Sequence, residues 1–335
     1  MSKVAFITLG CKVNQYETNA MSQEFIEKGY EVVEHHEKAD IYVINTCTVT
    51  NMSDRKSRRV KELNPNSIVI ACGCYVQVAK DEVAKIEDID LILGNNEKKN
   101  IVEHLEQYQK DKKRQLEIED LMQQREFIEF GDVTYTEKTR AVVKIQDGCD
   151  RFCSYCIIPY ARGRVRSRKP EGIISEITKI AQEGIKEVVI TGIHVASYGK
   201  DFKENYGLID LLEDLNKIEG IERIRLSSIE PLILDEQFIN RLSKLEKICH
   251  NFHLSLQSGC DETLKRMNRR YNTEQFKTVV NLIRNTYKDA ILTADVIVGF
   301  PGETEEEFEK TYKFLEDVKF YKTHVFKYSP RKGTK

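Results

Sequence analysis

The sequence predicts an α/β protein with two domains: an N-terminal parallel sheet of the Rossmann-like type, then a series of six strand–helix units. Short apolar runs alternate with segments of helical periodicity along the chain. A charge-dense stretch at 105–138, poor in aliphatic residues, separates the two series of runs. The length of 335 residues is enough for two hydrophobic cores. We therefore expect domains at 1–104 and 139–335, joined by a charged connector at 105–138.

The N-terminal domain begins with an apolar run at 3–9, which we expect to be a strand. A helix should follow over 11–30, because Met21, Phe25 and Ile26 recur at helical spacing. Two further strands are expected at 41–47 and 67–75, and the first of them leads into a polar helix rich in Arg and Lys. Strands that alternate with helices form parallel sheets, and the carboxyl edge of such a sheet collects ligands.

Three cysteines, Cys11, Cys47 and Cys74, each fall just past the carboxyl end of one of these strands. Because the ends of parallel strands share one edge, we expect the three thiols to meet in space. Each lies in a polar turn, where backbone N–H groups can stabilise a thiolate. We interpret them as three ligands of one metal cluster, against the alternative of buried small apolar side chains. Cys72, on the same face of the strand as Cys74, is an alternative ligand.

The second domain should begin with a strand at 141–148. Five later apolar runs are expected to be strands, separated by helical patterns such as PEGIISEITKIAQEG. These five runs are KEVVITG, RIRLSS, NFHLSLQSG, TADVIVGFPG and THVFKYS.

A C-x3-C-x2-C motif, formed by Cys149, Cys153 and Cys156, follows the first strand of this domain. Three thiolates so close in sequence indicate a metal cluster. They are one ligand short of a closed zinc site or a ferredoxin cluster, so a 4Fe–4S cluster bound here keeps one iron open. A zinc knuckle with a distant fourth ligand is the alternative.

This motif resembles the signature of radical S-adenosylmethionine (SAM) enzymes, in which SAM chelates the open iron through its amino and carboxylate groups. The resemblance implies an open partial (β/α)6 barrel, with SAM as a cofactor and Tyr155 placed against the adenine. In barrels the loops after the strands form the site. Here these loops provide glycines for close backbone approach and polar groups for the ribose and the SAM amino group. The residues concerned are Gly192, Ser228, Glu230, Gln257 and Gly299.

The segments TLGCKVNQYET, VINTCTVT, CGCYVQ and GCDRFCSYCIIPYARG together resemble the methylthiotransferase family of radical SAM enzymes. This resemblance implies two 4Fe–4S clusters, an auxiliary one on Cys11, Cys47 and Cys74 and a SAM-binding one on Cys149, Cys153 and Cys156. It also implies the reaction: one SAM donates a methyl group to a sulfur, another is cleaved to a deoxyadenosyl radical, and a methylthio group replaces a hydrogen on the substrate carbon.

The GCKVNQYE form resembles the subgroup that modifies carbon 2 of threonylcarbamoyladenosine beside the anticodon of tRNA. Lys12 could pair with the threonyl carboxylate there. Sibling groups act on isopentenyladenosine in tRNA or on an aspartate of a ribosomal protein, and these remain alternatives. The non-enzymatic alternative is an iron–sulfur electron carrier or an RNA-binding regulator. An electron donor of the flavodoxin or ferredoxin type is an expected partner. The family's last barrel helix and C-terminal RNA-binding domain are not in the sequence, which we interpret as a truncation.

The charge balance of 52 basic and 54 acidic residues means that any RNA site must be a local patch. One such patch is the run RGRVRSRK, in which we expect Arg162, Arg164, Arg166 and Arg168 to contact RNA. A second is expected in the helix after Cys47, at Arg55, Lys56, Arg58, Arg59 and Lys61. Nine cysteines without a secretory signal, and no apolar run of spanning length, predict a cytoplasmic protein with no membrane role.

Overall fold

The computed structural model describes residues 1–48, 59–131, 133 and 139–334. It divides into two compact units, one formed by Met1–Glu137 with Tyr160–Arg164 and the other by Lys138–Pro159 with Val165–Lys335. Each unit has its own parallel sheet, so the α/β fold class predicted from the sequence is confirmed.

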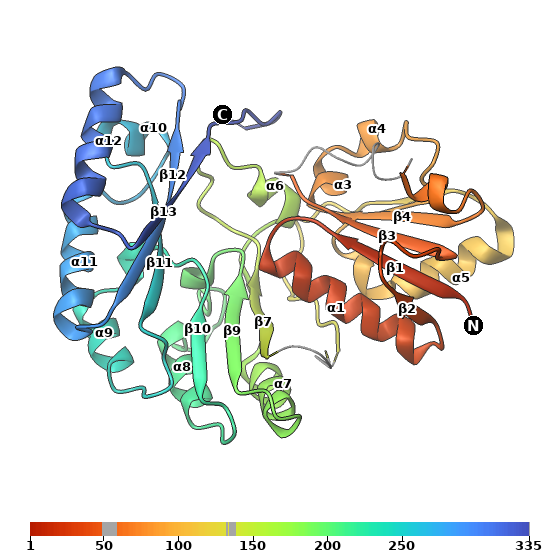
Figure 1. Cartoon of the computed structure of the whole chain (residues 1–335), viewed down its shortest axis with the longest axis horizontal. Coiled ribbons are helices and arrows are strands. Elements are labelled where there is room, and N and C mark those ends of the chain that lie inside the picture. The colour runs from red at the N-terminus through yellow and green to blue at the C-terminus, as the bar shows by residue number, and fades with distance from the viewer. Residues whose placement is uncertain (49–58, 132, 134–138, 335) are drawn as a thin grey trace. The chain divides into compact units, whose positions relative to one another are not determined.

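The first unit is a six-stranded parallel sheet in the order β2-β1-β3-β4-β5-β6 (Figure 1). Its strands are β1 (Lys3–Thr8), β2 (Glu31–Val33), β3 (Ile41–Thr46), β4 (Ile68–Gly73), β5 (Leu91–Leu93) and β6 (Gln115–Glu117). Its helices are α1 (Lys12–Glu27), α3 (Cys74–Val78), α4 (Lys80–Val83), the 3-10 turn η1 (Glu97–Asn100) and α5 (Ile101–Asp111).

Both faces of this sheet are buried, because helices pack on each of them. Successive strand residues point to opposite sides and so contribute to both cores. One face packs Val4, Ile41 and Ile70 against apolar residues of α1 and α5, such as Phe25 and Leu105. The other face packs residues such as Tyr42, Ile44 and Val69 against Val76 of α3 and Val83 of α4. The strands expected at 3–9, 41–47 and 67–75 and the helix expected at 11–30 are all present, with slightly shorter bounds.

The stretch 105–138, which we expected to be a connector, contributes to this first sheet in its described part. Helix α5 continues to Asp111, and β6 pairs in parallel with β5. Leu121 and Val133 are also buried. A three-residue strand carries too little periodicity to be recognised in so charged a segment, which explains the difference.

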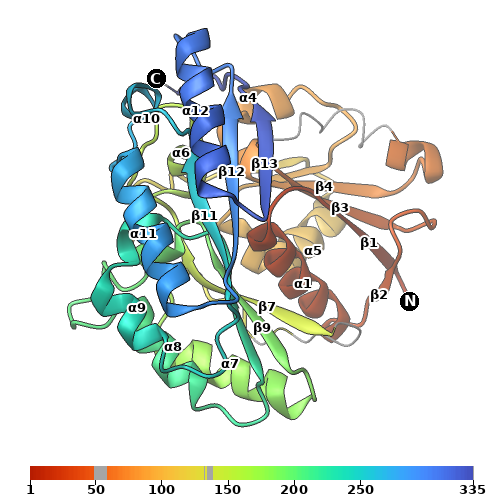
Figure 2. The ribbon, with the colours of Figure 1, turned by 60° about the vertical axis from the view of Figure 1, so that its left-hand side comes forward.

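The second unit forms a curved, open sheet with helices along its outer face (Figures 1 and 2). Its strands are β7 (Arg140–Asp147), β8 (Arg166–Ser167), β9 (Glu187–Gly192), β10 (Arg223–Leu226), β11 (Asn251–Gln257), β12 (Ile291–Val298) and β13 (Lys322–Lys327). Its helices are α7 (Pro170–Gln182), α8 (Leu208–Asn216), α9 (Glu236–Leu242), α10 (Asp261–Arg266), α11 (Thr273–Thr286) and α12 (Glu305–Val318), with 3-10 turns η2 (Val195–Ser197) and η3 (Pro231–Ile233). The short helix α6 (Ile158–Arg162) begins in this unit, but its residues from Tyr160 onward belong to the first unit.

The strand order is β10-β9-β7-β8 in one part of this sheet and β11-β12-β13 in the other. The two parts are joined by parallel bridges from Ile224 to Ile248 and from Ile229 to Leu254. All six expected strands run parallel, as in an open partial barrel, and their carboxyl ends share one edge. The short strand β8 pairs antiparallel to the end of β7 and was not predicted.

Candidate functional site

The C-x3-C-x2-C loop leaves the carboxyl end of β7 through Gly148, whose φ of 71° only glycine adopts readily. Phe152, inside the loop, also has a positive φ of 47°. A bulky residue in that conformation is uncommon and is typical of a backbone constrained by its function. The loop thereby holds Cys149, Cys153 and Cys156 in a single short turn region, each half-buried.

Two arginines donate hydrogen bonds to sulfurs of this loop, Arg151 from within it and Arg269 from outside it. The backbone N–H of Arg151 donates to Cys149 Sγ at 3.4 Å, and Arg269 Nη1 donates to Cys153 Sγ at 3.3 Å. The turn after α10 anchors the rest of the loop, because Ser154 N donates to Met267 O at 3.1 Å and Asn268 Nδ2 to Phe152 O at 3.0 Å. Donors aimed at ligand sulfurs orient the ligands and tune a bound metal.

The sulfur chemistry fits an iron–sulfur cluster better than a single ion. Burial raises the pKa of Cys149 to about 11 and that of Cys156 to about 12, so the thiols ionise when a metal provides compensating charge. Ligands of one zinc ion lie close together, because Zn–S bonds are about 2.3 Å long. Among the described residues, neither cysteine trio has all three Sγ atoms within 4.8 Å of one another.

The predicted SAM-contacting residues all lie at the carboxyl edge of the second sheet. Tyr155 packs edge-on against Phe300, with ring centroids 6.3 Å apart. Gly192 ends β9 against Gln146, whose backbone O would lie 3.0 Å from any added Cβ. Gln257 ends β11 with a φ of 70°, and Gly299 follows β12 with a φ of 71°. Ser228 is exposed in the loop after β10. A ligand-contact role for these residues stays a prediction.

Glu230 is the most constrained of them, because it is buried beside Arg151 and His194. It forms an ion pair with Arg151, and His194 Nε2 lies 3.4 Å from its Oε2 atom. Burial alone would raise the pKa of Glu230, but the nearby His194 and the charges of Arg151 and Arg269 lower it to about 2. Glu230 is therefore a carboxylate at neutral pH, which suits a contact to an ammonium or hydroxyl group.

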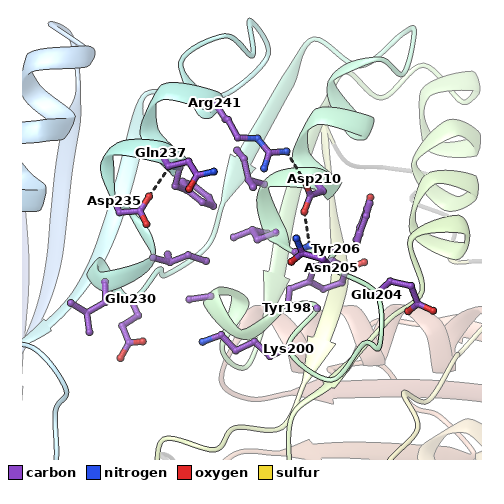
Figure 3. Close-up of a pocket in the computed structure, with 18 of the residues that line it drawn as sticks. Tyr198, Lys200, Glu204, Asn205, Tyr206, Asp210, Glu230, Asp235, Gln237 and Arg241 are labelled. Atoms are coloured by element: carbon purple, nitrogen blue, oxygen red, sulfur yellow. Dashed lines mark hydrogen bonds and ion pairs between the residues drawn. The ribbon is translucent and has the colours of Figure 1, made fainter.

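A cavity of about 650 Å3, lined in part by Arg151 and Glu230, opens in the second unit (Figure 3). It lies between the segment that joins η2 to α8 and the segment from η3 to α9. Lys200 and Glu230 lie at one end of the cavity, and Arg241, which is ion-paired to Asp210, lies at the other (Figure 3). Asn205 and Gln237 add amide groups to its lining. The cavity therefore offers donors and acceptors for a polar substituent.

The auxiliary cysteines follow the register of the first sheet. Thr46 at the end of β3 pairs with Gly73 at the end of β4, so Cys47 and Cys74 start from neighbouring positions. Thr8 at the end of β1 pairs with Asn45, and Cys11 lies three residues further along the chain. The strand ends therefore bring the three cysteine-bearing loops to one edge. Their role as cluster ligands stays a prediction.

Two glycines allow these loops to approach each other. Gly10 has a φ of 95°, and a Cβ there would lie 2.5 Å from Cys47 Sγ. Gly73 has a φ of 102°, and a Cβ there would collide with Thr46 O. Cys72, the alternative ligand, packs in the apolar core with Val4 and Ile41, and burial raises its pKa to about 11. This position favours Cys74, the first residue of α3, over Cys72 as the ligand.

The basic run after the cysteine motif is mostly interior. Arg162, Arg166 and Arg168 are at most 4 % exposed, and carboxylates of the protein contact their guanidinium groups. The three interior arginines therefore form ion pairs within the protein. RNA contact stays a prediction for Arg164, which is exposed. In the second basic patch, Arg55, Lys56 and Arg58 lie outside the described residues, whereas Lys61 bonds Ser67 O at 2.6 Å.

Several residues of these sites were not singled out from the sequence. They are Asn14, Glu17, Asn95, Lys98, Arg269 and Asn268. No local pattern marks Asn95, Lys98, Asn268 and Arg269, because tertiary packing brings them to these sites over long sequence separations. The one available signal is that Asn14 and Glu17 lie three and six residues after Cys11 in the same motif.

Comparison with known families agrees with this geometry. A model described as the radical SAM superfamily matches residues 143–315, and one described as uncharacterized protein family UPF0004 matches residues 3–94. A threonylcarbamoyladenosine tRNA methylthiotransferase, MtaB of Aquifex aeolicus, is 45 % identical over 99 % of this chain and 82 % of its own length. The chain belongs to the radical SAM methylthiotransferase family. The resemblance inferred from the sequence is thereby confirmed.

Two further relatives in sequence and one solved structure of similar fold resemble this chain. MtaB of Bacillus subtilis is 43 % identical over 100 % of this chain and 75 % of its own length. The tRNA-2-methylthio-N(6)-dimethylallyladenosine synthase of Clostridium botulinum is 37 % identical over 98 % of this chain and 74 % of its own length. The radical SAM methyltransferase TsrM of Kitasatospora setae has a similar fold, with a TM-score of 0.67 at 15 % identity over 97 % of this chain and 73 % of its own.

As a radical SAM methylthiotransferase, the chain uses SAM and 4Fe–4S clusters as cofactors, as the sequence predicted. Each set of three cysteines lies within one of the two matched regions. In the described part of the chain, no helix is long and apolar enough to cross a membrane.

Proposed function

We propose that this chain methylthiolates carbon 2 of threonylcarbamoyladenosine beside the anticodon of tRNA. The observation that carries the proposal is the pair of cysteine trios, each at the carboxyl edge of its own parallel sheet and each one ligand short of a closed cluster. The names of the two MtaB relatives support this substrate. We place the reaction in the cytoplasm, where tRNA is modified and thiols stay reduced.

In this proposal the two sets of three cysteines bind two different clusters. Cys149, Cys153 and Cys156 bind the SAM-binding cluster, and Cys11, Cys47 and Cys74 bind the auxiliary cluster. When bound, the clusters and SAM supply the radical hydrogen abstraction and the methylthio group, chemistry that side-chain acids and bases cannot perform on an unactivated C–H bond. A flavodoxin- or ferredoxin-like protein supplies the electron.

Other residues position the cofactors. Arg269 and the backbone N–H of Arg151 fix the sulfurs of Cys153 and Cys149. Gly192, Gln257 and Gly299 let the strand ends approach SAM closely, while Ser228 and Glu230 bond its polar groups. Tyr155, packed against Phe300, gives the adenine an apolar surface.

Substrate choice depends on a cation for the threonyl carboxylate. Lys12, exposed as the first residue of α1, is our first choice because it follows Cys11 directly. Lys200, at one end of the cavity in Figure 3, is the second. Replacing the correct lysine by Ala should raise KM for threonylcarbamoyladenosine tRNA about tenfold or more, while cluster content stays unchanged. An isopentenyladenosine tRNA, which has no carboxylate, is the control substrate.

Nucleoside mass spectrometry tests the function as a whole. We expect tRNA from cells that lack the gene to lose the methylthio group from threonylcarbamoyladenosine and to regain it when the gene is restored. Restoration with Cys149→Ala or Cys74→Ala should fail. Loss confined to isopentenyladenosine would instead assign the sibling activity, and unchanged tRNA would exclude both tRNA substrates.

A further inference from the structure

The side chain of Arg162, at the end of α6, is fully buried within the first unit. It comes six residues after Cys156 in sequence, yet the stretch Tyr160–Arg164 packs with the residues that bear Cys11, Cys47 and Cys74. A buried guanidinium is costly unless it is paired and hydrogen-bonded, so its position needs a physical reason.

The guanidinium touches one of the auxiliary cysteines directly. Arg162 Nε donates to Cys74 Sγ at 3.0 Å, which is a short hydrogen bond for a sulfur acceptor. Its Nη2 donates to Asn14 Oδ1 at 2.6 Å and to Glu17 Oε2 at 3.0 Å, and its Nη1 also contacts Glu17. Lys98 Nζ holds the same carboxylate of Glu17 at 2.6 Å. The planar fork of Arg162 is thus fixed on several sides while one N–H points at sulfur.

The same network reaches the loops of the other two cysteines through Asn14. Its Nδ2 donates to Leu9 O at 2.8 Å and to Thr46 O at 2.9 Å. Leu9 lies two residues before Cys11, and Thr46 lies directly before Cys47. On the other side, Asn95 Nδ2 donates to Ala161 O at 2.7 Å and fixes the backbone next to Arg162. One hydrogen-bonded unit therefore contacts all three cysteine loops.

We propose that Arg162 is a positioning residue for the auxiliary cluster, which orients the sulfur of Cys74 and raises the reduction potential of the cluster. The inference rests on the proposed role of Cys11, Cys47 and Cys74 as ligands. A charged hydrogen-bond donor on a ligand sulfur stabilises the added negative charge of the reduced cluster. Asn14 and Glu17 hold the guanidinium in the orientation that points Nε at the sulfur, as supporting groups do for other metal ligands.

Potentiometry on the full chain tests this. In a background with Cys149, Cys153 and Cys156 replaced by Ala, the auxiliary cluster is reconstituted anaerobically and titrated with its EPR signal as the readout. Arg162→Gln should shift the one-electron reduction equilibrium at least about tenfold toward the oxidised form, which is about 59 mV. Glu17→Gln should shift it the opposite way, because it removes a negative charge beside the same guanidinium. The matched control is Arg125→Gln, an exposed arginine of the same unit that should change nothing.

The results distinguish an error in the ligand assignment from an error in the role of Arg162. A background protein that takes up no auxiliary iron would overturn both the ligand assignment and this inference. A cluster that forms normally, with equal potentials in Arg162→Gln and the control, would overturn the inference alone. If Arg162→Gln does not fold, Arg162→Lys takes its place, since it keeps the charge but not the fork. The Arg162→Lys variant should lose iron to a chelator several times faster than Arg125→Gln, and equal rates of iron loss would contradict the proposal.

Discussion

Gly10 and Gly29 share a left-handed backbone but differ in their surroundings. Their φ values are 95° and 85°, so alanine at either position strains the backbone by roughly 1–2 kcal/mol. Only at Gly10 would the new Cβ meet Cys47 Sγ, whereas nothing lies within 4 Å at Gly29. We expect Gly10→Ala to lower auxiliary iron content by more than half, with Gly29→Ala as the control of equal strain. Equal iron retention in both variants would show that Cys47 tolerates displacement.

Glu24, a half-buried residue of α1 that faces Val102 of α5, should make the stability of the first unit pH-dependent. Burial raises its pKa to about 7, against a partial offset from the N–H of Val102. The folded state therefore binds the proton of Glu24 more tightly than the unfolded state does. The stabilising contribution of protonated Glu24 to the free energy of unfolding is fully present below pH 4.5 and is lost as pH rises through 7. Because the side chain is partly exposed, we discount the effect to roughly 1–2 kcal/mol.

Urea unfolding at pH 5 and pH 8 measures this contribution. Glu24→Gln should gain stability relative to the wild type at pH 8 and little at pH 5. Glu27→Gln, at the exposed end of the same helix, is the control. A gain at pH 8 of the same size in both variants would assign the effect to general surface charge.

At the scale of single residues, the sequence placed the cysteines correctly at strand ends because strand ends can be recognised from apolar runs. It misjudged the setting of Arg162, Arg166 and Arg168. A run of cations looks solvent-exposed in sequence, whereas partners such as Glu17 and Glu176 come from other elements and remove these side chains from water.

Among the helices, α12 begins with a capping box formed by Thr304 and Glu307. The Thr304 hydroxyl accepts from Glu307 N at 3.3 Å, and this satisfies one of the unpaired N–H groups of the first turn. Thr304→Ala should therefore destabilise the second unit by about 1 kcal/mol, measured as a lower midpoint in thermal unfolding. Thr278→Ala, on the exposed face of α11, should leave the midpoint unchanged or raise it slightly. A midpoint unaffected by Thr304→Ala would mean that Glu307 holds the helix end through Arg266 alone.

Elements with strong periodicity were predictable, and short ones were not. Six of the seven strands of the second unit, and helices such as α7 and α11, repeat apolar residues at a clear period. Strands β2, β5 and β6 have three residues each, and β8 has two, so they form because neighbouring strands offer backbone partners. Sequence periodicity contains no information on such pairing.

For the whole molecule, the iron content distinguishes the proposal from its alternatives. Anaerobic reconstitution should give about eight irons per chain, since each 4Fe–4S cluster adds about four. Replacing either cysteine trio by Ala should leave about four. Cys249→Ala and Cys260→Ala, outside both trios, are the controls and should keep about eight. Tightly bound zinc, or four irons in the unaltered chain, would contradict the two-cluster assignment.

The position of Tyr160–Arg164 in the first unit affects the order in which the protein is completed during synthesis. When translation reaches Glu137 all strands of the first sheet have been synthesised, but Arg162 follows 25 residues later. At an elongation rate of about 5–20 residues per second this delay is about 1–5 s, and in that interval Cys74 exists without its guanidinium partner. Sulfur and iron delivered to the nascent chain would therefore meet a loosely held ligand. We expect the auxiliary centre to be filled only after the C-x3-C-x2-C loop has been synthesised.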